Sequence, residues 1–171
     1  MMRTMDQPSL TSVQVPVTIR DLRRADLPAC GWSGSALHVK HIGHALDRAA
    51  AGEADYLALC PPSGLPIAVG GVDFAPRADA GTLWQLSVHP ALRSCGLGTL
   101  LVQALEDRAR ARGRGWAVLG VEDTNPRARA LYERLGYEPY GSEPAAWDQE
   151  EADGSVRRYE TVCTLLRKPL S

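Results

Sequence analysis

The segment from Arg93 to Gly98 carries the residues best suited to chemistry in this chain. It reads RSCGLG and lies between a predicted strand and a predicted helix. The first N–H groups of a helix lack partners and carry partial positive charge, and glycines let phosphate oxygens approach them. With the Arg93 guanidinium beside it, the segment predicts a pyrophosphate-binding loop. A plain tight turn into a helix would also use Gly96 and Gly98.

Two well-known phosphate motifs do not fit this segment. The Walker pattern GxxxxGK[ST] is absent from the chain. The dinucleotide pattern GxGxxG fails because no third glycine follows Gly98 and no acidic residue closes the next strand at the expected distance. A nucleotide-phosphate binder of another kind stays open as a minor alternative.

A second motif follows one predicted helix and one predicted strand later. Residues 125–137 read NPRARALYERLGY. They resemble the Asn-x-x-Ala-x-x-Leu-Tyr-x-x-x-Gly-aromatic segment of the GCN5-related N-acetyltransferase (GNAT) family, and Arg93-x-x-Gly96-x-Gly98 resembles that family's coenzyme loop. The resemblance is specific from Thr82 to Tyr140, and before that only the order of elements agrees.

The resemblance implies an acetyl-CoA site between two splayed parallel strands. The pantetheine arm would pair with backbone groups of residues 86–88, the pyrophosphate would meet the N–H groups of residues 94–99, Asn125 would bind by its amide, and Tyr132 would stand near the thioester sulfur. The implied coenzyme-binding residues are Leu86, Ser87, Val88, Arg93, Ser94, Cys95, Gly96, Leu97, Gly98, Thr99, Asn125 and Tyr132.

Acyl transfer to an amine makes three demands on these residues. The amine must lose a proton, the carbonyl oxygen needs a donor for its growing charge, and the leaving thiolate benefits from a proton. The Val88 N–H is the expected donor to the oxygen, and the Tyr132 hydroxyl is the expected acid. The alternative for Tyr132 is packing on its helix with Leu131 and Leu135.

The general base is where the chain departs from the family pattern. Two positions that hold a glutamate in some members are Thr82 and Gly120 here. Glu122 is the first candidate, since it lies two residues after Gly120 and side chains alternate along a strand. Asp73 and His89 follow, and a water chain or an amine arriving unprotonated would serve equally.

The elements that must position these residues alternate along the chain. Apolar periodicity and turn residues predict helices over 21–27, 35–51, 97–112 and 126–135, and strands over 15–20, 56–60, 66–74, 82–88, 116–121, 137–140 and 156–166. The acidic segment 142–154 is expected to be a long hairpin loop. We expect an α/β fold, with a flexible tail over 1–13 and one acetyltransferase domain over 14–171, whose mixed, strongly twisted sheet carries helices on both faces.

Composition and charge argue against several classes of binding partner. A net charge of −1 and the absence of a long apolar run argue against nucleic-acid and membrane partners. Four scattered cysteines without CxxC spacing argue against a zinc site, no metal is expected, and the polar N-terminus favours the cytoplasm. A homodimer is common in the family that the chain resembles, and the sequence leaves the oligomeric state open.

The predicted function is acetyl transfer from acetyl-CoA to a primary amine of an unidentified small molecule, peptide or protein, by direct transfer. The alternative is a non-catalytic acyl-CoA sensor or interaction module on the same fold. The sequence does not identify the acceptor.

Overall fold

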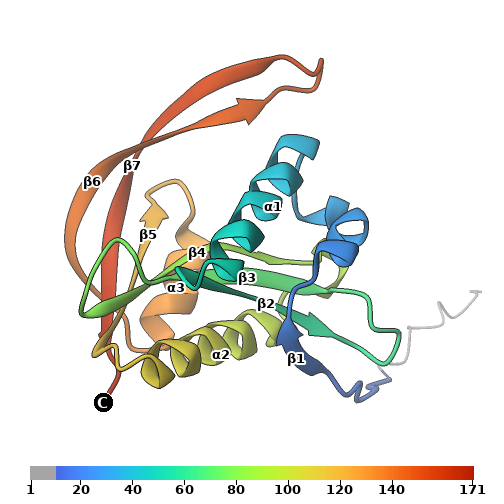
Figure 1. Ribbon diagram of the computed structural model, residues 1–171, viewed down its shortest axis with the longest axis horizontal. Helices are drawn as coiled ribbons and strands as arrows, with labels where there is room; N and C mark the ends of the chain where they lie inside the picture. The colour runs from blue at the N-terminus through green and yellow to red at the C-terminus, as the bar shows by residue number, and fades with distance from the viewer. Residues whose placement is uncertain (1–10) are drawn as a thin grey trace, which may run out of the picture.

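A mixed sheet organises the computed structural model, which describes residues 11–171 (Figure 1). Within those residues the sheet has seven strands in the order β1-β2-β3-β4-β5-β7-β6, and only β4 and β5 run parallel. The strands are β1 (Thr18–Asp21), β2 (Ala54–Cys60), β3 (Ala68–Asp73), β4 (Ala80–Val88), β5 (Trp116–Glu122), β6 (Glu138–Glu150) and β7 (Val156–Pro169). The helices are η1 (Arg24–Ser33), α1 (Ala36–Ala50), η2 (Pro90–Leu92), α2 (Leu97–Ala111) and α3 (Pro126–Arg134).

Helices cover both faces of the sheet, as predicted. One buried cluster joins α2 and α3 to the sheet through residues such as Leu101 and Leu119. A second cluster joins η1 and α1 to the other face through residues such as Ile42 and Tyr56. The mixed α/β fold with a twisted sheet is therefore confirmed (Figure 1).

Strand β4 carries an extra residue that changes its course. Val69 pairs with Ser87, but Gly71 pairs with Trp84, so three steps on β4 oppose two on β3. The extra residue is accommodated at Gln85, whose φ of 54° lies in the left-handed region. Gly71 is required opposite, because a Cβ there would lie 2.4 Å from the Trp84 ring. The bulge bends β4 just before its last three residues.

The first helical prediction was wrong in type and extent. Of the segment predicted as a helix over 21–27, Asp21 ends β1, and the last four residues begin the 3₁₀ helix η1, which continues to Ser33. Asp26 fixes its start: it accepts two hydrogen bonds from the Arg20 guanidinium at 2.7 and 3.0 Å and one from the Arg23 N–H. Of the predicted tail 1–13, residues 1–10 lie outside the described residues.

The acidic segment predicted as a loop is a strand. Strand β6 runs for 13 residues and pairs with β7 from Glu138 to Glu150, so only residues 151–155 form the turn. Its polar side chains gave no strand signal because most of them are exposed. The backbone ladder and cross-strand contacts hold the ribbon together, among them Trp147 on Tyr159 at 5.0 Å between ring centroids. The hairpin projects past the sheet and arches toward α1 (Figure 1).

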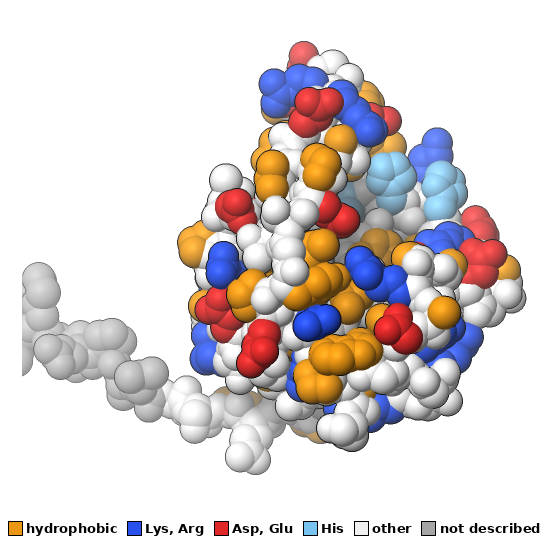
Figure 2. Space-filling view, turned by 90° about the vertical axis from the view of Figure 1, so that its left-hand side faces the viewer, with side chains coloured by type: hydrophobic (Ala, Val, Ile, Leu, Met, Phe, Trp, Pro, Cys, Tyr) orange, Lys and Arg blue, Asp and Glu red, His pale blue; other side chains and the backbone are white. Residues whose placement is uncertain are grey.

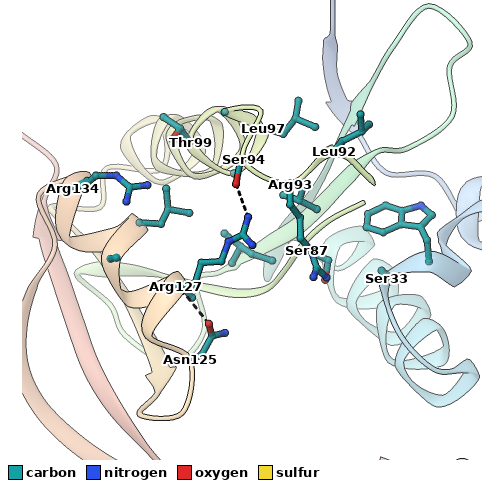
Figure 3. A pocket seen from close by; sticks show the side chains of 18 residues that line it. Ser33, Ser87, Leu92, Arg93, Ser94, Leu97, Thr99, Asn125, Arg127 and Arg134 are labelled. Atoms are coloured by element: carbon teal, nitrogen blue, oxygen red, sulfur yellow. Dashed lines mark hydrogen bonds between the residues drawn. The ribbon is translucent and has the colours of Figure 1, made fainter. Parts of the chain in front are cut away.

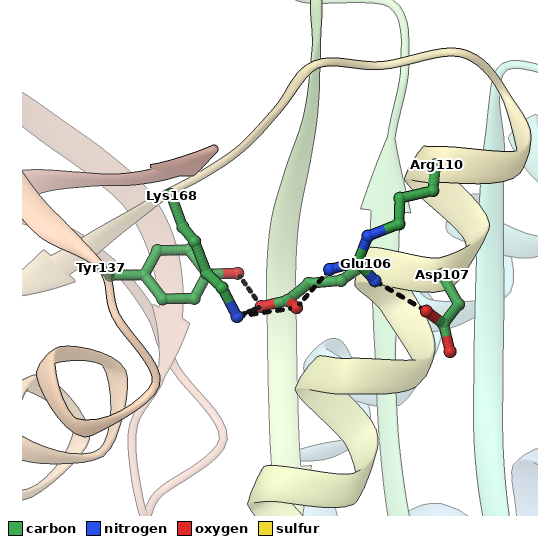
Figure 4. Close-up of polar contacts among 5 residues, drawn as sticks. All are labelled: Glu106, Asp107, Arg110, Tyr137 and Lys168. Atoms are coloured by element: carbon green, nitrogen blue, oxygen red, sulfur yellow. Dashed lines mark hydrogen bonds and ion pairs between the residues drawn. The ribbon is translucent and has the colours of Figure 1, made fainter. Parts of the chain in front are cut away.

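A buried carboxylate ties α2 to the end of the chain (Figure 4). Glu106 is 1% exposed and accepts hydrogen bonds from the Tyr137 hydroxyl at 3.0 Å and from the Lys168 ammonium at 3.0 and 2.9 Å. Arg110 adds a contact at 3.4 Å. Burial, and then the neighbouring carboxylate, raise the pKa of Tyr137. This Glu106 cluster fixes α2, and with it the loop at the start of α2.

The surface mixes charges of both signs. In Figure 2 acidic and basic side chains lie interspersed, and the hairpin rises beside histidine side chains across a recess. Within residues 11–171, no helix has the length and apolar character to cross a membrane.

Candidate functional site

The gap between β4 and β5 is the starting point of the site. The two strands pair only from Ala80 to Thr82 on the β4 side, and beyond the bulge β4 keeps only β3 as its neighbour. The His89 N–H donates to the Ile67 carbonyl on the β3 side at 2.8 Å. Backbone groups alternate in direction along a strand, so those of Leu86 and Val88 point into the gap. The same alternation turns the backbone groups of Ser87 toward β3.

The loop after β4 presents uncapped N–H groups to the same space. Ser94 and Gly96 have positive φ values of 65° and 82°, and this turns the chain sharply into α2. No side chain of the described chain caps α2 at Gly96, which leaves the N–H groups of its first turn free for an anion. Gly98 lets α3 approach, because a Cβ there would lie 3.2 Å from the Leu131 side chain.

One cavity of about 740 Å³ unites the gap, the loop and α3 (Figure 3). It contains almost all of the predicted coenzyme-binding residues. Those on its wall are Leu86, Ser87, Val88, Arg93, Ser94, Gly96, Leu97, Gly98, Thr99 and Asn125. Cys95 lies in the loop but is exposed, and its thiol contacts the Arg93 carbonyl at 3.7 Å. The sequence thus identified residues that the fold brings into one space.

Asn125 has a structural task at the cavity. Its side-chain oxygen caps α3 by accepting a hydrogen bond from the Ala128 N–H at 3.1 Å. The oxygen is therefore engaged, and the amide nitrogen is the part of the side chain that remains as a donor toward a ligand.

Three guanidiniums also line the cavity, and two of them were given no role from the sequence. They belong to Arg93 in the loop and to Arg127 and Arg134 on α3. Arg127 reaches across the cavity and donates to the Ser94 hydroxyl at 2.7 Å (Figure 3). The signal that identifies the α3 pair is their spacing of seven residues, which puts both on one helix face.

Tyr132 lies behind this wall rather than on it. Its ring packs against the main core, with its centroid 5.9 Å from that of Tyr137. Burial raises the pKa of Tyr132 to about 12, so the hydroxyl keeps its proton at neutral pH. On the same helix, Ala128 and Leu131 line the cavity, whereas Tyr132 does not.

Glu122 ends β5 on the opposite side of the sheet from α2. Leu119 and Val121 face the α2 core, so alternation turns Glu122 toward the α1 face together with Gly120. Its carboxylate accepts a hydrogen bond from the Tyr159 hydroxyl at 3.0 Å and does not line the cavity. Tyr159 of the β6–β7 hairpin therefore contacts this candidate base.

The other two base candidates are engaged elsewhere. Asp73 accepts two hydrogen bonds from the Arg48 guanidinium at 2.6 and 2.7 Å, at the far end of β3. The His89 ring nitrogen Nδ1 accepts from the Ala91 N–H at 3.2 Å, and its ring lies 5.3 Å from that of Trp32. Trp32 lines the end of the cavity, so His89 lies near that end.

The β6–β7 hairpin and α1 enclose the side of the molecule away from α3. Glu150, at the end of β6, accepts a hydrogen bond from the Leu37 N–H in the first turn of α1 at 3.0 Å. Tyr159, the hydrogen-bond partner of Glu122, pairs with Trp147 across the hairpin. This side therefore offers aromatic and acidic groups, whereas the cavity offers guanidiniums and backbone N–H groups.

Comparisons with solved structures match this architecture. The ribosomal-protein-S18-alanine N-acetyltransferase from Escherichia coli is 24% identical over 91% of this chain and 95% of that chain, with a TM-score of 0.66. A phosphinothricin acetyltransferase from Sinorhizobium meliloti, solved in complex with AcCoA, is 19% identical over 91% of this chain and 89% of that one, with a TM-score of 0.67. At these identities the likeness concerns the fold.

Sequence comparison gives one relative that matches part of the chain and one family model that matches more than half of it. A mycothiol acetyltransferase from Beutenbergia cavernae is 44% identical over 64 residues, which are 37% of this chain and 22% of the relative. The match therefore spans about a fifth of that relative's length. The family model described as "Acetyltransferase (GNAT) family" matches residues 21–137, from the end of β1 to the aromatic residue after α3. The chain therefore belongs to the acetyltransferase (GNAT) family.

Proposed function

We propose that this protein transfers an acetyl group from acetyl-CoA to a primary amine within one ternary complex. The observation that carries the proposal is the parting of β4 from β5 directly beside the uncapped start of α2. This arrangement offers backbone pairing to a pantetheine arm and N–H groups to a pyrophosphate in one continuous cavity. Family membership supports the acyltransferase class.

In this proposal the chain holds the coenzyme chiefly with its backbone. Leu86 and Val88 bind the pantetheine arm in the gap, and the first N–H groups of α2 together with Arg93 bind the pyrophosphate. The Val88 N–H stabilises the charge that grows on the thioester oxygen as the amine nitrogen attacks. The carbon–sulfur bond breaks as the carbon–nitrogen bond forms, and the Tyr132 hydroxyl gives its proton to the departing sulfur.

Glu122 is the group that is proposed to accept the proton that the attacking amine loses. In this proposal the acceptor enters from the face between α1 and the hairpin, where the Glu122 carboxylate accepts a hydrogen bond from Tyr159. A water chain or an amine that arrives unprotonated would replace it without changing the rest of the mechanism. Acidic and aromatic groups on this side favour a cationic acceptor such as a polyamine, an aminoglycoside or a lysine side chain.

Release of free CoA thiol, measured against a panel of such amines, tests the proposed function. We expect turnover with at least one amine, and Tyr132→Phe should lower kcat on the order of 10²-fold while the Kd for acetyl-CoA stays unchanged. Tyr140→Phe is the matched control, because Tyr140 lies on β6 under the Arg77 and Arg167 guanidiniums and off the cavity wall.

The base is tested separately by the pH dependence of kcat/KM. Glu122→Gln should lower kcat/KM across the pH range, and Tyr159→Phe, which removes the hydrogen bond to the Glu122 carboxylate, should lower it less. A Glu122→Gln variant that keeps the full rate at every pH would exclude Glu122.

One observation favours the sensor as a second candidate. Neither Tyr132 nor Glu122 lies on the cavity wall, so the coenzyme-binding parts are formed independently of the two proposed catalytic groups. Tight acetyl-CoA binding without thiol release on any amine of the panel would favour the sensor over the enzyme.

A further inference from the structure

The cavity carries more positive charge than a pyrophosphate alone would need. Among residues 11–171, its wall includes three guanidiniums and no Asp or Glu. Within the same residues, no carboxylate lies within ion-pair distance of Arg93, Arg127 or Arg134, although nine other arginines of that part of the chain form salt bridges, as Arg129 does. Positive charge that has no protein partner and faces a cavity is suited to an anionic ligand.

The three guanidiniums follow the cavity in order. Arg93 lies beside Ser87 near the strand gap, Arg127 crosses to the loop, and Arg134 lies at the other end near Thr99 (Figure 3). Seven residues of helix separate the two α3 arginines by about 10 Å along the axis. The charge therefore extends from the gap, past the loop, and along α3.

The inference rests on the proposed function. The order of the three arginines along the cavity can then be matched to the order of the charged groups in coenzyme A. The pantetheine arm belongs in the gap, and the pyrophosphate belongs at the first N–H groups of α2 beside Arg93. The adenosine end, which bears a separate phosphate on its 3′ oxygen, must then lie beyond the loop, along α3. Arg127 and Arg134 are the cations at that end.

We propose that Arg127 and Arg134 form the subsite for the 3′-phosphate and make the protein selective for the 3′-phosphorylated coenzyme over its dephospho form. A guanidinium has five N–H donors in a planar fork that fits a phosphate. Arg127 can therefore keep its hydrogen bond to Ser94 and still donate to a phosphate oxygen. Arg134 closes the subsite from the last turn of α3.

The proposal is tested by measuring the Kd of acetyl-CoA and of acetyl-3′-dephospho-CoA for the full chain by calorimetry. We expect wild type to bind acetyl-CoA on the order of tenfold more tightly, the low end of what hydrogen bonds to charged groups contribute at an exposed site. Arg134→Gln should weaken acetyl-CoA binding and leave the dephospho form unchanged. Arg127→Gln, which also removes the hydrogen bond to Ser94, should weaken acetyl-CoA binding more than binding of the dephospho form, so both variants bring the ratio toward one.

Arg129→Gln is the matched control. Arg129 lies on the same helix but is paired with Glu133 at 2.8 Å and is off the cavity wall, so the ratio of the two Kd values should stay at its wild-type level. Both α3 arginines of the subsite are exposed, and the thermal midpoints of the variants should confirm that they fold.

The outcomes separate this inference from the proposed function. Tight binding of both coenzymes with a ratio near one would overturn the 3′-phosphate subsite and leave the proposed function standing. A ratio that survives both α3 substitutions, or equal weakening of both coenzymes by them, would also overturn it. Failure of both coenzymes to bind wild type would overturn the proposed function and this inference together.

Discussion

The two ends of α2 hold their charged side chains in opposite ways. Toward its C-terminus, Glu106 is buried among Tyr137, Lys168 and Arg110, and every charge has a partner inside the protein. At its N-terminus, Arg93 faces a cavity wall on which, among residues 11–171, there is no acidic side chain. Glu106 is buried on the helix, whereas Arg93 is exposed in the loop before it, and the two also differ in the presence of a charged partner.

The difference separates structural charge from binding charge. Arg108 and Arg112 illustrate the first kind, since both reach the Asp55 carboxylate and join α2 to β2. Their charges are paired with a carboxylate of the protein. The cavity guanidiniums have no such partner among the described residues and are proposed to bind a ligand. Changes at one end of α2 should therefore alter stability, and changes at the other end should alter binding.

Removing the buried carboxylate should have the largest effect on stability. Glu106→Ala strands the Lys168 ammonium and the Tyr137 hydroxyl, and breaking a buried pair in this way costs about 3–5 kcal/mol in the free energy of unfolding. Chemical denaturation of wild type and Glu106→Ala measures this loss of unfolding free energy. The control is Glu133→Ala, which removes the exposed pair with Arg129 and should cost about 0.3–0.5 kcal/mol. Equal losses in the two variants would contradict a structural role for the buried cluster.

Tyr137→Phe should have a smaller effect, and one that depends on pH. It removes a hydrogen bond to a charged group, worth about 1.5–3 kcal/mol at neutral pH. Burial raises the pKa of Tyr137 in the folded protein, whereas the unfolded chain releases this proton near pH 10. The stabilisation by the neutral phenol is therefore complete below about pH 10 and is lost as the pH rises toward the folded pKa.

The measurement is the difference in unfolding free energy between wild type and Tyr137→Phe from pH 7 to pH 11.5. We expect a constant difference up to about pH 9 and a decline above pH 10 of at most about 1.4 kcal/mol per pH unit. A difference that stays constant over the whole range would show that Tyr137 titrates alike in both states.

The cavity side, where the coenzyme is proposed to bind, could be outlined from the sequence because it is built from local features. A glycine turn, an uncapped helix start and the Asn125 cap are each encoded within a few residues. The strand gap also has a local cause, the bulge at Gln85, although nothing in the amino-acid sequence indicated a bulge at that residue. The two α3 arginines went unassigned because an arginine on an exposed helix face is ordinary until the loop opposite it is known.

The other side could not be predicted because its contacts are distant in sequence. Glu150 meets Leu37 across the molecule, and Tyr159 meets Glu122 across the sheet. The part of β6 after residue 141 was mistaken for a loop, because its ladder with β7, and not apolar side chains, makes it a strand. Sequence patterns report burial, and an exposed two-stranded ribbon buries little on either face.

Charge removal at the N-terminal end of α2 should change binding and leave stability nearly untouched. Arg93→Gln should weaken acetyl-CoA binding about tenfold, the effect of losing one charge-assisted hydrogen bond at an exposed site, and should shift the unfolding free energy by less than about 0.5 kcal/mol. Arg108→Gln is the mirror-image control: it breaks the contacts to Asp21 and Asp55, so it should lower stability and keep the wild-type Kd.

Salt refines the same comparison, because exposed charges are screened and buried ones much less so. Raising the ionic strength should weaken acetyl-CoA binding to wild type more than to Arg93→Gln, whereas the stability difference between wild type and Glu106→Ala should hardly move. If the Kd values of wild type and Arg93→Gln responded to salt in parallel, Arg93 would not contact the coenzyme's charge. The N-terminal end of α2 would then have no role in binding charge, and only the α3 arginines would remain as candidates for that role.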